Sequence, residues 1–122
     1  MSVVLSFTSP PPGLAPHTAF TLDPVEGAAG LFAMHAVGDR LRVYLVDPQS
    51  VMAGYAPTLT DQQAADLALT GPGDALVLVV AHPTDGGVAV NLMAPVVVNR
   101  ATGAAAQVIL EDQGYPLRMM LS

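Results

Sequence analysis

The chain has 122 residues, 52% of them hydrophobic, and its ten acidic residues against four arginines and no lysine give a formal net charge of −6. A chain of this length forms one domain, 1–122, without a disulfide or a metal, and it has no cysteine to form either a disulfide or a thiolate site. A surface without lysine cannot build a phosphate-binding stripe, so we expect no direct nucleic-acid binding. No apolar run approaches the roughly 20 residues of a membrane-spanning helix, so we expect no membrane location.

The first part of the chain contains runs rich in β-branched and aromatic residues, which favour strands. We expect four strands here, over residues 3–7, 18–22, 30–36 and 41–46. Pro10-Pro11-Pro12-Gly13 ends the first strand because proline donates no backbone hydrogen bond. Gly38-Asp39 predicts a tight hairpin turn between the last two strands.

An irregular segment over residues 49–57 precedes the one helix that the sequence predicts. Thr60 is a favourable N-cap residue, and Gln63 three residues later completes a capping-box pattern. An apolar face follows, and Gly71-Pro72-Gly73 is expected to end the helix after about two to three turns.

From Asp74 onward the pattern again favours strands, over residues 75–82, 88–93, 96–99 and 104–110. The last two should pair across the turn Arg100-Ala101-Thr102-Gly103. Some eight strands with short loops and one short helix predict a mainly β, small single-domain antiparallel fold, closed or nearly closed as a barrel, which also removes exposed strand edges.

Residues for catalysis or metal binding are not arranged in any familiar pattern. The three histidines, His17, His35 and His82, have no metal-ligand spacing, and no nucleophile motif is present. Glu111 and Asp112 are adjacent, so on an extended chain they point to opposite faces and cannot act as an acid/base pair. We therefore expect no enzyme, no cofactor and no metal site.

A binding surface is the remaining possibility, near the C-terminal end. An aromatic ring, a guanidinium and flexible thioethers are the groups enriched in protein interfaces, and they gather in Tyr115, Leu117, Arg118, Met119, Met120 and Leu121, with Tyr55 expected nearby. Residues 119–121 are expected to be a tail whose removal costs little stability. Two points stay open. The alternative to a binding surface is that Tyr115 and Leu117 pack into the barrel while Arg118 pairs with an internal acid. Glu111 and Asp112 either bind a partner or only solvate a strand end.

The same region carries a resemblance to a known family. Asn91-Leu92-Met93-Ala94-Pro95-Val96-Val97-Val98-Asn99, then Gln107-Val108-Ile109-Leu110-Glu111-Asp112, then Tyr115-Pro116-Leu117-Arg118 stand in the order and spacing of a C-terminal signature. This pattern resembles the FliW family of flagellar assembly factors. The resemblance is strong over residues 74–118, moderate over 43–68, where Tyr55 is kept but the acids usual around it are not, and slight over 1–40.

The resemblance implies a cytoplasmic protein that binds flagellin and, once flagellin is exported, binds and antagonises the RNA-binding translational repressor CsrA, which relieves repression of flagellin translation. The acidic net charge suits a basic protein partner, although it can also serve only to keep an apolar domain soluble. A small ligand-binding β-barrel is the alternative, and it should show a deep apolar cavity where a partner-binding module has a filled interior.

Overall fold

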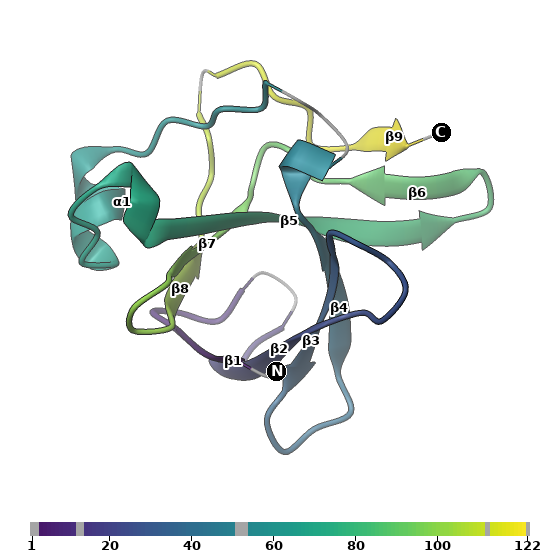
Figure 1. Cartoon of the computed structure of the whole chain (residues 1–122), viewed down its shortest axis with the longest axis horizontal. Helices are drawn as coiled ribbons and strands as arrows, with labels where there is room; N and C mark the ends of the chain where they lie inside the picture. The colour runs from purple at the N-terminus through teal and green to yellow at the C-terminus, as the bar shows by residue number, and fades with distance from the viewer. Residues whose placement is uncertain (1–2, 12–13, 51–53, 112, 122) are drawn as a thin grey trace.

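The computed structural model describes residues 3–11, 14–50, 54–111 and 113–121 and is built mainly from β-strands (Figure 1). The strands are β1 (Val3–Phe7), β2 (Ala19–Pro24), β3 (Leu31–Ala36), β4 (Arg42–Val46), β5 (Ala75–Thr84), β6 (Gly87–Val90), β7 (Val96–Asn99), β8 (Ala104–Gln107) and β9 (Met119–Leu121). One α-helix, α1 (Asp61–Asp66), and two short 3₁₀ turns, η1 (Pro48–Ser50) and η2 (Pro72–Asp74), complete the described elements. No helix in these ranges is long and apolar enough to cross a membrane.

Seven of the strands close into a barrel, which confirms the predicted fold class. Their order is β4-β3-β2-β1-β8-β7-β5, and β5 pairs again with β4 to close the ring. The neighbours are antiparallel except β1 and β8, which pair in parallel through Ser6↔Ala104 and Phe7↔Ala105. β6 and β9 continue the sheet beyond β5, outside the ring.

Two hydrophobic cores lie on opposite faces of β5 and β7. The first fills the barrel and contains Leu5, Phe20, Met34, Leu45, Leu78, Val96 and Val98. The second covers the outer face and contains Tyr55, Leu67, Val79, Val90, Leu92, Val97 and Leu110. All four residues of β7 are buried, which explains why this strand is an uninterrupted apolar run up to Asn99 rather than an alternating pattern.

Helix α1 forms where the capping box predicted it. The Thr60 side chain accepts a hydrogen bond from the Gln63 amide, and the Gln63 side chain accepts one from the Thr60 amide. The helix ends at Asp66, well before the expected glycines, because Leu67 turns into the second core and Ala68 adopts a positive φ of 54°. Burial of Leu67 therefore decides where the helix ends.

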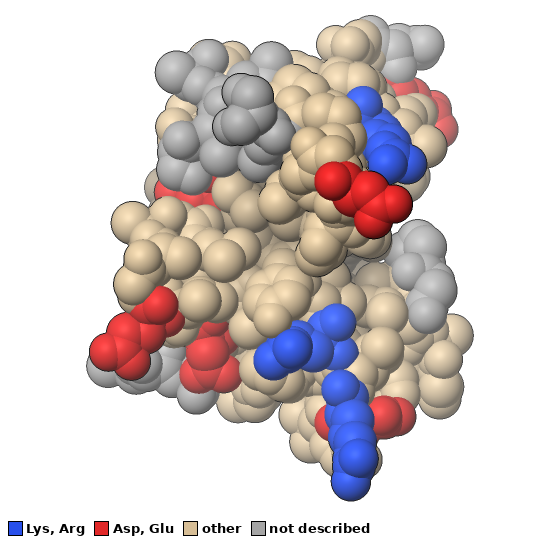
Figure 2. All heavy atoms as spheres, turned by 90° about the vertical axis from the view of Figure 1, so that its right-hand side faces the viewer, with Lys and Arg blue, Asp and Glu red and all other residues tan. Residues whose placement is uncertain are grey.

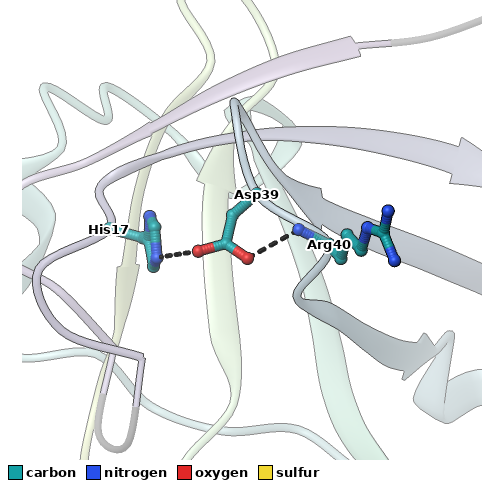
Figure 3. A network of polar contacts seen from close by, with 3 residues as sticks. All are labelled: His17, Asp39 and Arg40. Carbon is teal, nitrogen blue, oxygen red and sulfur yellow. Dashed lines mark hydrogen bonds and ion pairs between the residues drawn. The ribbon is translucent and has the colours of Figure 1, made fainter.

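A polar contact joins the loop before β2 to the β3–β4 turn (Figure 3). His17 Nε2 lies 3.0 Å from Asp39 Oδ2, and Asp39 Oδ1 accepts a hydrogen bond from the Arg40 amide. Gly38 has a φ of +80° in this turn, as the hairpin prediction requires. The side chains of His17 and Asp39 are both partly exposed, so the contact positions the loop but contributes little to stability.

Candidate partner-binding site

The C-terminal segment, residues 113–121, is held against the rest of the chain by contacts from three places. Gln113 and Thr58 exchange two hydrogen bonds, of 2.9 and 2.8 Å. The Tyr115 hydroxyl accepts a hydrogen bond from the Ala56 amide at 3.2 Å. The Leu92 amide donates to the Pro116 carbonyl at 3.1 Å. The central irregular segment and the β6–β7 connection thereby fix the course of this segment.

Tyr55 lies beneath that surface rather than in it. Its side chain is only 3% exposed, its hydroxyl donates to the Leu92 carbonyl at 2.6 Å, and its ring meets Tyr115 edge to face at 4.6 Å between centroids. Burial, with a smaller contribution from the neighbouring Tyr115, raises the pKa of Tyr55. Tyr55 therefore supports Tyr115 from below.

Leu117 and Arg118 lie at the surface, in a groove of about 450 Å³. The other wall comes from β5 and β6 and includes His82, Pro83, Thr84, Ala89 and Val90. Leu117 is 64% exposed, and Arg118 is exposed in the groove rather than paired with an internal acid. We call this feature the C-terminal groove. His82 and Pro83 were not predicted as a wall of this groove, because their position beside Leu117 and Arg118 depends on the pairing of β6 with β9.

The remaining predicted residues take different positions. Met119 and Met120 belong to β9, where Met119 packs on the second core and Met120 is 46% exposed. Glu111 is exposed, Asp112 lies outside the described residues, and Leu121 contributes its backbone to the pairing with Val88. The expectation of a free tail is wrong, since residues 119–121 pair with all but the first residue of β6.

The amide side chains of the C-terminal signature have structural contacts. Asn91 Oδ1 accepts hydrogen bonds from the Met93 and Ala94 amides and shapes the turn after β6. Gln107 Nε2 donates to the Ala94 carbonyl, and Asn99 joins the end of α1 to the β7–β8 turn. These residues maintain the fold that presents the C-terminal groove.

The barrel interior does not form a deep ligand cavity in the part of the chain that the structure describes. Side chains of the first core fill it, leaving a pocket of about 210 Å³ at one mouth between Leu14, Met34, Val43 and Val96. Histidine and acidic side chains in the same part of the chain form no group of three that could hold a metal ion. The filled interior favours a partner-binding module over the ligand-binding alternative.

The side that carries β6 and β9 has a mixed surface. Figure 2 shows basic and acidic groups on this side, some of them next to one another, among residues that are mainly uncharged. Leu117, Met120 and Val88 are among its exposed apolar residues. A mixed surface of this kind is suited to protein contacts in which a few apolar and arginine anchors dominate.

Comparison with known proteins agrees with the architecture. A family model described as FliW protein matches residues 1–121. A crystal structure of the flagellar assembly factor FliW superimposes with a TM-score of 0.89 at 26% identity, over 96% of this chain and 84% of that one. The flagellar assembly factor FliW of Geobacillus kaustophilus strain HTA426 is 30% identical over 121 residues, which cover 97% of this chain and 83% of that protein.

A shorter match has higher identity. The flagellar assembly factor FliW of Syntrophus aciditrophicus strain SB is 34% identical over 76 residues, or 61% of this chain, and the aligned region spans about half of that protein, 48%. The family model, the relatives and the solved structure agree with the resemblance carried by residues 91–118. The chain therefore belongs to the FliW family of flagellar assembly factors.

Proposed function

We propose that this chain binds flagellin in the cytoplasm and, when flagellin is exported, binds a CsrA-type translational repressor and antagonises it. The observation that carries the proposal is the exposed C-terminal groove on a chain whose whole length matches the family. Leu117 and Arg118 supply an apolar and a cationic anchor beside a mainly uncharged surface. Binding of this kind requires no catalytic group.

Isothermal titration calorimetry with the flagellin of the same bacterium tests the first half. We expect a one-to-one complex, and no heat of binding at tens of micromolar flagellin would contradict it. Arg118→Ala should weaken binding by roughly 1 to 2 kcal/mol if the guanidinium is a desolvated anchor. Arg40→Ala is the matched control, because Arg40 is an exposed arginine in the distant β3–β4 turn and should leave affinity unchanged.

The repressor half rests on charge as well as on shape. The net charge of −6 suits the basic RNA-binding region of such a repressor, and opposite charges accelerate association. The association rate, measured by stopped flow, should fall as salt shortens the Debye length below about 10 Å. A rate independent of salt would instead indicate a mainly apolar contact.

A partner switch further requires that the two complexes exclude each other. Saturating flagellin should displace the repressor from this chain in a competition experiment, with a midpoint set by the ratio of the two affinities. Formation of a stable ternary complex would contradict a simple exchange of partners.

A further inference from the structure

One edge of β5 is paired over only part of its length. β4 pairs with this edge from Tyr44↔Ala81 to Val46↔Val79. β4 ends at Val46, and the chain then continues into η1. Residues 75–78 pair with β7 on the opposite edge. Among the described residues, no strand pairs with the β4 side of β5 before Val79.

The register identifies which backbone groups face this open edge. The Arg100 amide donates to the Asp74 carbonyl across the β5–β7 ladder, and the Asn91 amide donates to the Val80 carbonyl on the same side of β5. In an antiparallel ladder alternate residues bond to the same neighbour, so the even-numbered residues of β5 face β7 and β6. The N–H and C=O groups of Ala75 and Val77 therefore point to the open edge.

A groove runs along this edge. Ala75, Val77 and Pro57 line both a cavity of about 280 Å³ that extends toward Gln49 and one of about 410 Å³ that extends toward α1. The second cavity is mostly apolar and is also lined by Leu59, Ala64 and Leu69. The two cavities adjoin at these three residues, and together we call them the β5 edge groove.

The opposite wall is formed within residues 54–60, since Pro57 and Leu59 line the cavities together with Ala75 and Val77. The Gln49 side chain donates to the Tyr55 carbonyl at 2.8 Å, and Tyr55 is anchored in the second core. Pro57, which lines both cavities, has no amide hydrogen to offer the open strand edge.

Two carboxylates lie near the α1 end of the groove, and Arg100 lines the cavity that extends toward Gln49. Asp61 lies three residues before Ala64 and therefore on the same side of the helix. Asp74 immediately precedes Ala75, and hydrogen bonds from the Thr70 hydroxyl and amide lower the pKa of its carboxyl. These carboxylates complement a basic side chain placed at this end.

We propose that the β5 edge groove binds an extended segment of a partner protein as an added strand, with apolar side chains at alternate positions and a lysine or arginine at the α1 end. The backbone groups of Ala75 and Val77 pair with the added strand, and the apolar wall selects its side chains. This surface shares no lining residue with the C-terminal groove.

Nuclear magnetic resonance with a defined peptide tests the proposal directly. The probe is an acetylated, amidated six-residue peptide that begins with arginine and continues with alternating valine and serine. In the ¹⁵N-labelled free chain, the amides of Ala75 and Val77 should exchange with solvent faster than those of Leu76 and Leu78, and they should slow when peptide is added. Equal protection in the free chain, or no change at about 5 mM peptide, would overturn the proposal.

Two changes to the peptide separate strand addition from nonspecific contact. Two peptides are compared, one N-methylated at its odd-numbered amides and one at its even-numbered amides. One of the two should bind about tenfold more weakly, because only one set of amides faces the β5 edge. Glutamate in place of the arginine should weaken binding severalfold. A peptide that binds equally well after every one of these changes is not adding as a strand.

A matched pair of variants tests the same point from the protein's side. Val77→Pro removes the amide that faces the groove while leaving the β7 ladder intact, since the bonded residues of that ladder are the even-numbered ones. Val77→Thr keeps the amide and nearly the same volume. Peptide affinity should fall about tenfold in Val77→Pro and stay near the original in Val77→Thr. Unchanged affinity in Val77→Pro overturns the proposal, and if that variant fails to fold, the N-methylated peptides decide.

Discussion

Asn99 shows how one buried polar side chain can join two turns. It is 4% exposed, its Nδ2 donates to the Leu67 carbonyl at 2.8 Å, and its Oδ1 accepts from the Ala101 amide at 2.9 Å. Asn99→Ala would leave these backbone groups without partners, and we expect it to lower the free energy of unfolding by about 2 kcal/mol in urea denaturation. The exposed Gln62→Ala should change it by less than about 0.5 kcal/mol, and equal effects of the two would contradict this role.

At the same scale, Tyr55 predicts a dependence of stability on alkaline pH. Its pKa is raised by burial, so above the ordinary value of 10.0 the unfolded chain releases a proton that the folded chain retains. The folded state then binds more protons, and the free energy of unfolding falls as the pH rises through and beyond 10.0. Urea denaturation between neutral and alkaline pH measures this.

Tyr55→Phe is the control for the pH series. It removes the titrating group together with the hydrogen bond to Leu92, so the variant should be less stable at neutral pH by about 1 kcal/mol and lose stability less steeply above pH 10.0. Parallel pH curves for the two proteins would show that other groups cause the loss.

The sequence identified residues of the candidate site where exposure follows from local chemistry. Leu117 and Arg118, next to a proline and near the chain end, lie at the surface as expected. Tyr55 does not, because its position is set by Leu92, which is 37 residues away in the chain, and by Tyr115. Local composition carries no information on contacts at that separation.

Among the elements, β9 divides its side chains between structure and surface. Met119 packs on the second core, whereas Met120 is exposed beside the β5–β6 turn. Met119→Ala should lower the free energy of unfolding by about 1 to 2 kcal/mol, and Met120→Ala by less than about 0.5 kcal/mol. Thermal unfolding of the two variants measures the difference, and the reverse order would contradict the orientation of β9.

Local elements were the most predictable from sequence. The capping box at Thr60, the turn at Gly38 and the strand over residues 96–99 occur where the pattern predicts them. β9 was not predicted, because three residues carry no periodic pattern and their partner β6 lies about 30 residues earlier in the chain. The parallel pairing of β1 with β8 was not predicted for the same reason, since it joins distant parts of the sequence.

For the whole molecule, the sharing of β5 and β7 between two cores has a thermodynamic consequence. Leu78 is buried in the barrel and its neighbour Val79 in the second core. Leu78→Ala and Val79→Ala should each destabilise one and the same cooperative transition, by about 2 to 4 kcal/mol, with calorimetric and van't Hoff enthalpies that agree. Two separate transitions, each shifted by only one of the variants, would show that the cores unfold independently.

The arrangement of β7 also bears on how this family can diverge. A strand that contributes to both cores has no position at which a side chain can change size or polarity freely, and the amide side chains around it are committed to backbone groups. Packing therefore restricts which substitutions this stretch can accept. Packing does not restrict the exposed residues of the two grooves in this way, so a substitution there can change the contacts to a partner without loss of the barrel; Leu117 and Arg118 are residues of this kind, although they belong to the motif.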